Sequence, residues 1–184
     1  MNPSPASFFD WPAIKAQLER QKKADLIQLI QELTAVSAEG QRYVQARYAS
    51  KKHTFVRLTP YKEVIRDQFT FSDWNNTVSW NFVGVQKAVD DYLQSSQGDE
   101  VGVCELLVTA LEAAMSFADS INLQADDFDS DVTALAERCV ELLSDHPDLH
   151  RQYVPRLKKV RKMGNDLGYF ALDEAFDNLS SRSE

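Results

Sequence analysis

The chain has 184 residues, of which 43% are hydrophobic and 26% are charged, and its formal net charge is −8. This length fits a single domain with a buried core, and the composition lies far from the low hydrophobicity and high charge of disordered proteins. The small number of glycines and prolines, 6 of each, argues against a turn-rich sandwich or barrel and favours helices. We therefore expect one helical domain spanning residues 1–184, with flexible tails at residues 1–9 and 180–184.

The N-terminal segment predicts neither export nor membrane insertion. Residues 1–15 have no basic region ahead of an apolar one, and no run in the chain approaches 18 apolar residues. The cysteines Cys104 and Cys139 form no CxxC pair, and we expect two buried thiols in a reducing compartment. The sequence therefore predicts a cytoplasmic protein that does not bind a membrane.

The first third of the chain is expected to form short helices joined by tight turns. Asp10, with a proline two residues later, predicts the start of a first helix that ends near Lys22. After Asp25, apolar residues recur at i, i+3, i+4 and i+7, which predicts an amphipathic second helix ending near Ser37. A third helix is expected to carry the tyrosines at positions 43 and 48.

The middle of the chain is less regular. We expect Thr54–Leu58 to be extended and Thr59 with Pro60 to start a fourth helix. Residues 71–79 mix aromatic and turn-forming residues without a clear period, and we predict no strand in the chain. A fifth helix is expected from about Trp80 to Gln94.

The second half has the clearest helical signals. Val101–Ile121 is apolar around most of its circumference and is predicted to be the central buried helix. Ala125–Asp131 is expected to be an acidic loop before the next helix, Pro147 to begin another, and Asp166–Leu179 to form the last. About nine helices indicate an all-α fold, either an irregular multi-helix bundle or a short α-solenoid of antiparallel helix pairs.

Charge is unevenly distributed along the chain. Residues 42–66 contain seven basic residues and one acidic residue, whereas residues 67–145 contain sixteen acidic and two basic residues. Residues 151–162 form a second basic segment. The two basic segments could together bind the phosphates of a nucleic acid. Alternatively, each could pair with the acidic middle of the same chain or with an acidic partner.

No catalytic, metal or nucleotide motif is complete. The acidic run 126–131 suggests calcium, but Val132 stands where the calcium loop needs glycine and Arg138 where it needs a bidentate glutamate. His146 and His150 have the spacing of a zinc protease pair, but the catalytic glutamate of HExxH is absent. The chain has no GxSxG, GxGxxG or Walker sequence. We therefore expect no metal and no cofactor, and we name no catalytic residue.

Four segments carry helix-face patterns of low specificity. They are Lys23–Leu33, Tyr61–Arg66, Val85–Tyr92 and Gly168–Phe170. In these segments the chain resembles a family of bacterial all-helical proteins known only as a domain of unknown function. The resemblance implies an all-helical fold and supplies no activity. In that family the glycine–aromatic ending is followed by a histidine and an aspartate, whereas here Ala171 and Leu172 precede Asp173, so no role of that histidine carries over.

The leading functional hypothesis is a non-enzymatic helical binding or adaptor protein that acts through protein–protein contacts. Two tryptophans in the least regular segment could anchor a partner, or they could instead fill the core. The alternative is a nucleic-acid-associated regulator that uses residues 42–66 and 151–162; an enzyme with an unrecognised site ranks third. The oligomeric state is left open. The candidate partner-binding residues are Trp74, Trp80, Arg47, Lys51, Lys52, Arg57, Arg156, Lys158, Lys159, Arg161 and Lys162.

Overall fold

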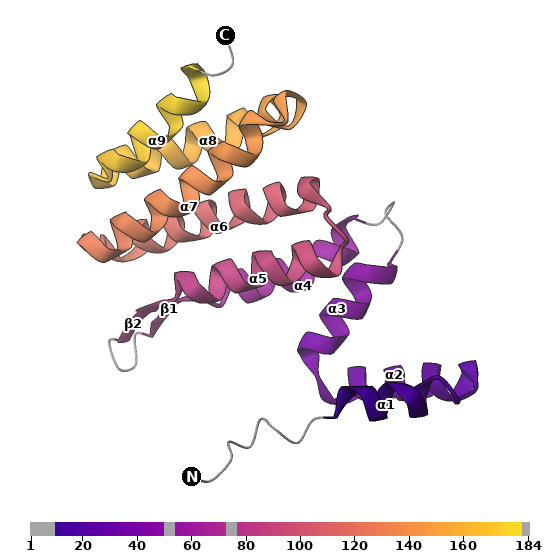
Figure 1. The fold of residues 1–184 in the computed structure, drawn as a ribbon. Coiled ribbons are helices and arrows are strands. Elements are labelled where there is room, and N and C mark those ends of the chain that lie inside the picture. The colour runs from indigo at the N-terminus through magenta and orange to yellow at the C-terminus, as the bar shows by residue number, and fades with distance from the viewer. Residues whose placement is uncertain (1–9, 50–53, 73–76, 182–184) are drawn as a thin grey trace, which may run out of the picture. The chain divides into compact units, whose positions relative to one another are not determined.

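A computed structural model describes residues 10–49, 54–72 and 77–181, which form nine α-helices and one β-hairpin (Figure 1). This confirms the predicted all-α, multi-helix fold. The helices are α1 (Trp11–Leu18), α2 (Lys23–Val36), α3 (Ala38–Tyr48), α4 (Thr54–Arg66), α5 (Phe82–Ser95), α6 (Glu100–Ile121), α7 (Asp126–Ser144), α8 (Pro147–Leu167) and α9 (Phe170–Ser181). The strands are β1 (Phe69–Ser72) and β2 (Thr77–Trp80).

The chain divides into two compact units, residues 1–41 and residues 42–184; a single domain over 1–184 stays a prediction. In the first unit, the Asp10 side chain caps α1 by accepting a hydrogen bond from the Ala13 amide at 3.1 Å. Helix α1 ends at Leu18 and not near Lys22, because residues 19–21 form a tight turn and Lys22 has an extended backbone. Neither α1 nor α2 contains a buried residue.

Helix α6 is the centre of the second unit. It packs against α4, α5, α7 and α8, and 13 of its 22 residues are buried. The prediction of a central buried helix is therefore confirmed. Among the described helices, α6 alone is long and apolar enough to cross a bilayer, and 72% of its most apolar window is buried inside the structure, as in the core helix of a bundle.

Helices α5 and α6 approach each other very closely at Gly102. A Cβ atom at this position would lie 2.3 Å from Tyr92 Oη, so the approach requires glycine. Tyr92 donates a hydrogen bond to Asp99 at 2.7 Å, and Asp99 caps α6 by accepting from the Gly102 amide at 3.2 Å. The connection between the helices turns through Gln97 and Gly98, with φ of 62° and 84°. The contact between Tyr92 and Gly102 therefore leaves no space for a larger side chain at position 102.

The segment Thr54–Leu58 is helical, and the expectation of an extended segment is wrong. Helix α4 begins at Thr54 and contains Pro60 in its interior. Proline has no backbone N–H, so the carbonyl four residues earlier, that of Val56, loses its partner within the helix. The side chain of Gln45 in α3 donates a hydrogen bond to this carbonyl at 2.6 Å. A distant side chain thereby compensates for the proline.

The prediction that no strand forms is also wrong, because residues 69–80 contain a hairpin. Strands β1 and β2 pair antiparallel, with Phe69 opposite Trp80 and Ser72 opposite Thr77. The Phe69 ring packs edge-to-face on Phe82, with centroids 5.4 Å apart. Four-residue strands are too short for a strong alternation in the sequence, and aromatic packing against the helices stabilises them.

Residues 126–131 form the first turns of α7 and not an acidic loop. Acidic side chains near a helix N-terminus interact favourably with the helix dipole, so an acidic run favours a helix start here. Phe128 lies within this run and is buried against the rings of Phe82, Phe117 and Tyr169. The aromatic residue therefore holds the start of α7 in the core.

Candidate functional site

Arg57, one of the predicted partner-binding residues, is bound within the fold. Its side chain is only 3% exposed, and its Nη1 atom lies 3.0 Å from Asp99 Oδ2. Its Nε donates to the carbonyl of Ala46 at 3.1 Å, near the C-terminal end of α3. Burial, together with the hydrogen bond to Asp99, raises the pKa of the neighbouring Tyr92. Arg57 thus joins α3, α4 and the start of α6, and its role in binding a partner stays a prediction.

Arg156 joins α8 to α6 through two carboxylates. Its Nε and Nη2 donate to Glu112 at 2.8 and 2.7 Å, and its Nη1 donates to Glu105 at 2.6 Å. Lys62 of α4 also binds Glu105. Burial would raise the pKa of Glu105, but the hydrogen bonds from Lys62 and Arg156 lower it below its usual value. Two cations from the basic segments therefore pair with the acidic middle of the same chain.

The other two predicted arginines also have partners in the chain. Arg161 of α8 binds Asp173 and lies 2.7 Å from Asp177, both in α9. The hydrogen bond from Arg161 lowers the pKa of Asp173. Arg47 of α3 is half-buried, and its Nη2 donates to the side-chain amide oxygen of Gln97 at 3.0 Å when that oxygen is turned towards the guanidinium.

The remaining predicted residues differ in their surroundings. Trp80 is half-buried and packs edge-to-face on Phe128, with ring centroids 5.6 Å apart, as expected for a residue that fills the core. Three lysines of α8 are exposed, and their side chains make no ion pair or hydrogen bond with the described residues. They are Lys158, Lys159 and Lys162. Lys51, Lys52 and Trp74 lie outside the described residues.

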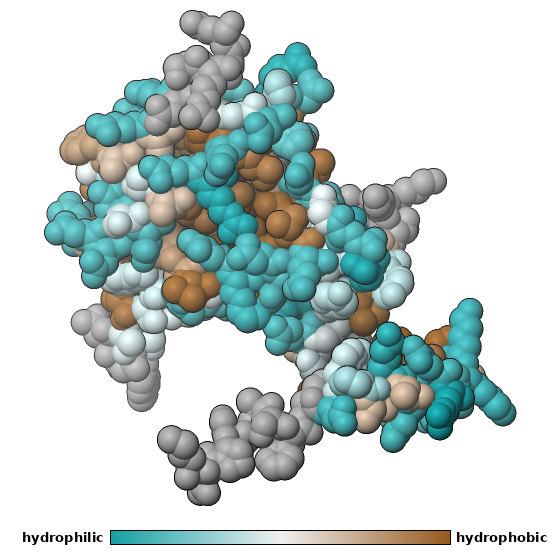
Figure 2. Space-filling model, in the orientation of Figure 1, coloured by the Kyte–Doolittle hydropathy of each residue, from teal (hydrophilic) through white to brown (hydrophobic). Residues whose placement is uncertain are grey.

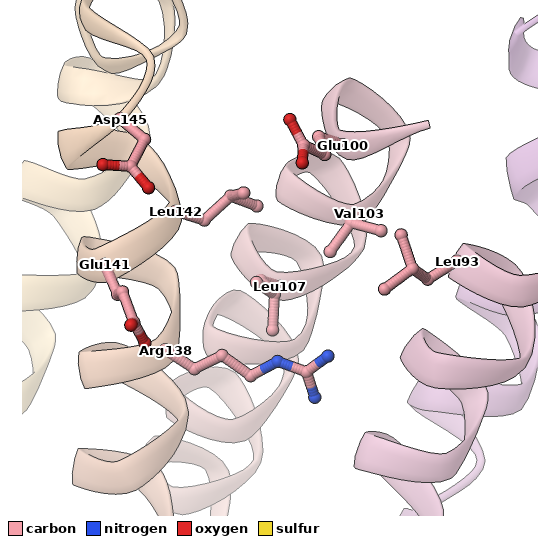
Figure 3. A pocket seen from close by; sticks show the side chains of 8 residues that line it. All are labelled: Leu93, Glu100, Val103, Leu107, Arg138, Glu141, Leu142 and Asp145. Carbon is pink, nitrogen blue, oxygen red and sulfur yellow. The ribbon is translucent and has the colours of Figure 1, made fainter. Parts of the chain in front are cut away.

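A pocket of about 250 Å³ lies between α5, α6 and α7, and none of its residues was predicted from the sequence (Figure 3). Val103 and Leu107 of α6 form a buried apolar floor, flanked by the half-buried Leu93 and Leu142. The volume lies below the roughly 300–1,000 Å³ of small-molecule sites, so it suits a single side chain of a partner. The lining residues are Leu93, Glu100, Val103, Leu107, Arg138, Glu141, Leu142 and Asp145.

The charge that remains uncompensated at this pocket is negative. Arg138 Nη2 lies 2.6 Å from Asp90 Oδ1, so its charge is balanced from α5. Glu100 Oε2 lies 2.7 Å from His146 Nε2. The side chains of Glu141 and Asp145 make no ion pair or hydrogen bond with any described residue. Two free carboxylates therefore stand beside an apolar floor.

These two carboxylates belong to a longer row on α7. Asp127, Asp131, Glu141 and Asp145 are all exposed, and their spacing places them on one side of the helix together with Arg138. None of the four carboxylates has an ion-pair or hydrogen-bond partner within the described ranges. We call these four residues the acidic face of α7. This face could not be recognised from the predicted elements, because Asp127 and Asp131 were expected to lie in a loop before the helix.

A second hollow of about 380 Å³ adjoins the pocket and shares Glu100 with it. It is lined by residues 96–101 together with Arg57 and His146. Its polar groups already contact one another, since Arg57 binds Asp99 and His146 Nε2 lies 2.7 Å from Glu100 Oε2. The predicted position of His146 just before a helix is confirmed, because α8 begins at Pro147. This hollow offers fewer free groups to a ligand than the pocket.

Neither metal binding nor thiol chemistry has a complete site in the described residues. Among them, no group of three or more His, Cys, Asp or Glu side chains is placed to hold a metal ion. Cys104 and Cys139 are both free and buried, which confirms the predicted buried thiols. A hydrogen bond with Cys104, and burial, raise the pKa of the Cys139 thiol, which disfavours the reactive thiolate.

Comparisons with protein-family models, with curated proteins and with solved structures found no match. The resemblance to a bacterial family of unknown function therefore stays a prediction.

Proposed function

We propose that the protein is a non-enzymatic helical binding protein that docks a basic segment of another protein on the α5–α6–α7 pocket. The observation that carries the proposal is the combination of an apolar floor, at Val103 and Leu107, with the free carboxylates of Glu141 and Asp145. Apolar burial supplies affinity, and opposite charge selects the partner and speeds its association.

The shape of the site indicates what the partner presents. A pocket of about 250 Å³ accepts one apolar side chain, and the acidic face of α7 extends from it towards Asp127. A helical segment with one apolar anchor and a row of lysines or arginines matches both features, because its own side chains repeat every three to four residues. Arg138 does not oppose such a partner, since Asp90 already balances its charge.

The nucleic-acid alternative has weaker support. Arg57, Arg156 and Arg161 are each bound to carboxylates of the same chain. Of the predicted cations in the described residues, the three exposed lysines of α8 make no ion pair, and Arg47 contacts only the uncharged amide of Gln97. These four cations would neutralise about four phosphates, whereas DNA-binding proteins commonly contact about 6–10. The net charge of −8 adds general repulsion of a polyanion.

Fluorescence anisotropy with two labelled synthetic helical peptides tests the proposal. One peptide carries leucine at i, i+3 and i+7 and lysine at its other surface positions, and the second has glutamate in place of lysine. We expect the lysine peptide to bind and the glutamate peptide not to bind. Replacing Glu141 and Asp145 by lysine should weaken this binding by at least about tenfold, because two attractive charges become repulsive.

A matched control separates docking from general charge attraction. The variant Asp119→Lys with Glu174→Lys changes the net charge equally, but its sites are exposed and do not line the pocket. It should keep most of the wild-type affinity. Equal losses in the two variants, or equal binding of both peptides, would contradict a pocket. Binding of labelled single-stranded DNA in place of the lysine peptide would favour the alternative.

A further inference from the structure

We propose that Asp90 of α5, which does not line the docking pocket, is a positioning residue that makes the pocket selective for a basic segment. Asp90 acts through Arg138 of α7. It holds the guanidinium on the α5 side of the pocket and thereby leaves the carboxylate of Glu141 free for the partner. This inference rests on the proposed function and names a determinant of its charge selectivity.

Arg138 lies within the acidic face of α7. Its side chain lines the pocket, and its place on the helix is between Asp131 and Glu141. An unbalanced guanidinium there would cancel part of the negative charge that attracts a lysine or an arginine. The direction that this side chain takes therefore decides how much negative charge the pocket presents to a partner.

The Arg138 side chain is directed towards α5. Its Nη2 atom lies 2.6 Å from Asp90 Oδ1. Figure 3 shows the side chain reaching from α7 towards α5, with its guanidinium pointing away from Glu141. Because only 31% of the Arg138 side chain is exposed, water screens this ion pair less than it screens a fully exposed one. The charge that balances Arg138 thus comes from a residue outside the pocket.

Glu141 is a second carboxylate within reach of Arg138 along the same helix. The two residues are three positions apart on α7, and side chains at this spacing are neighbours on a helix surface, where opposite charges attract. The side chain of Glu141 nevertheless makes no ion pair or hydrogen bond with any described residue. Arg138 pairs with Asp90 in its place, so Glu141 keeps its charge for a partner.

The other acidic residue at this point of α5 is already engaged. Asp91 Oδ2 lies 2.6 Å from Lys87 Nζ, one turn earlier on the same helix. Without Asp90, Arg138 turns to Glu141 on its own helix. The pocket then presents one free carboxylate in place of two, and a basic segment binds it less tightly.

Fluorescence anisotropy with the lysine peptide tests the role of Asp90. Asp90→Asn should weaken binding about fivefold, because Arg138 then neutralises Glu141. Arg138→Gln alone should bind at least as tightly as the wild type. Asp90→Asn combined with Arg138→Gln should return to within about twofold of the wild-type affinity, because no guanidinium is left to pair with Glu141. If the ion pair had only a structural role, all three variants would bind more weakly, since each lacks it.

A matched control is needed because charge alone attracts a basic peptide, and most of the visible surface of the larger unit is hydrophilic (Figure 2). Asp91→Asn changes the net charge equally, one residue away, and neither Asp91 nor its partner Lys87 lines the pocket. It should keep the wild-type affinity to within about twofold. Circular dichroism checks that each variant keeps its helices. Equal losses in Asp90→Asn and Asp91→Asn, or no recovery in the double variant, would overturn the role of Asp90.

The wild-type chain separates this inference from the proposed function. If the wild type binds the lysine peptide and Asp90→Asn binds it equally well, the docking pocket stands and the role of Asp90 is wrong. If the wild type binds neither the lysine nor the glutamate peptide, the proposed function fails, and the role of Asp90 fails with it.

Discussion

Both compact units of the chain contain amphipathic helices, but they differ in whether the apolar faces are buried within the unit. In residues 42–184, the apolar faces of α4 to α9 cover one another around α6, which packs against α4, α5, α7 and α8. In residues 1–41, α2 has an equally clear amphipathic pattern, but none of its residues is buried. Amphipathicity therefore predicts that a helix has an apolar face and does not reveal whether the same chain covers it.

The two units also differ in whether their charged residues form ion pairs between elements. In the larger unit, Arg57, Arg156 and Arg161 bind carboxylates of other helices, so ion pairs join its elements. The unpaired charges of this unit include the acidic face of α7 and the three exposed lysines of α8. In the smaller unit, the charged residues of α2 are exposed, and no ion pair joins α2 to another described element.

The largest effect should come from removing a core leucine. Leu111 of α6 is completely buried, and Leu111→Ala should lower the free energy of unfolding by about 2–5 kcal/mol because it leaves a cavity. Leu33→Ala in α2, where the side chain is 55% exposed, should change it by less than about 0.5 kcal/mol. Urea denaturation followed by circular dichroism measures both. Similar costs for the two substitutions would show that α2 is covered within its own chain.

A smaller effect is expected from adding one methyl group to a glycine in each unit. Gly102→Ala places a Cβ 2.3 Å from Tyr92 Oη, and overpacking of this kind costs about 1–3 kcal/mol. At Gly40 the nearest atom, Ser37 Oγ, would be 3.3 Å away. Alanine is the better helix former by up to about 1 kcal/mol, so Gly40→Ala should be neutral or slightly stabilising. Thermal unfolding of the two variants tests this, and a costly Gly40→Ala would mean that the smaller unit is tightly packed.

The smallest expected effect is a pH-dependent change in stability when Asp129 is replaced. Burial, and the nearby charge of Asp126, raise the pKa of Asp129 above its ordinary value of 3.8, and its Oδ1 atom is buried without a hydrogen-bond partner. The folded protein therefore binds this proton more tightly than the unfolded chain, so stability falls as pH rises through the folded-state pKa. Asp129→Asn should stabilise the protein at neutral pH, with a gain that shrinks below pH 4.

Asp25→Asn in the first turn of α2 is the matched control for this pH effect. Its carboxylate is exposed and favourably placed relative to the helix dipole, so the substitution should give no gain. Urea unfolding at a series of pH values compares the two variants. A gain at Asp129 that does not depend on pH would show that ionisation of the carboxyl group is not its cause.

Helices with long, local signals could be predicted from the sequence. Helix α6 follows from a continuous apolar run, and the caps at Asp10 and Pro147 mark helix starts because capping depends on neighbouring residues. The part of α4 before Pro60 could not be predicted, because the proline is tolerated inside the helix through a side chain eleven residues before the affected carbonyl. The hairpin was missed because strands of four residues carry too little periodicity.

The candidate site was less predictable than the fold. Charge runs drew attention to Arg57 and Arg156, but the sequence could not show that these cations bind Asp99, Glu105 and Glu112 of the same chain. The pocket brings together residues of three helices, from Leu93 to Asp145, and such a combination depends on packing. The acidic face of α7 was missed for a related reason, since Asp127 and Asp131 were expected to lie in a loop and only the folded helix brings them onto one side with Glu141 and Asp145.

The hydrogen bond from Gln45 to the carbonyl of Val56 couples positions 45 and 60 energetically. While residue 60 is proline, the glutamine supplies the donor that the helix lacks. If residue 60 had an N–H group, that carbonyl would have a partner within its own helix. The side chain at position 45 would then no longer be needed as a donor. The tolerance of α4 for its proline is therefore encoded in α3, and substitutions at positions 45 and 60 should be epistatic.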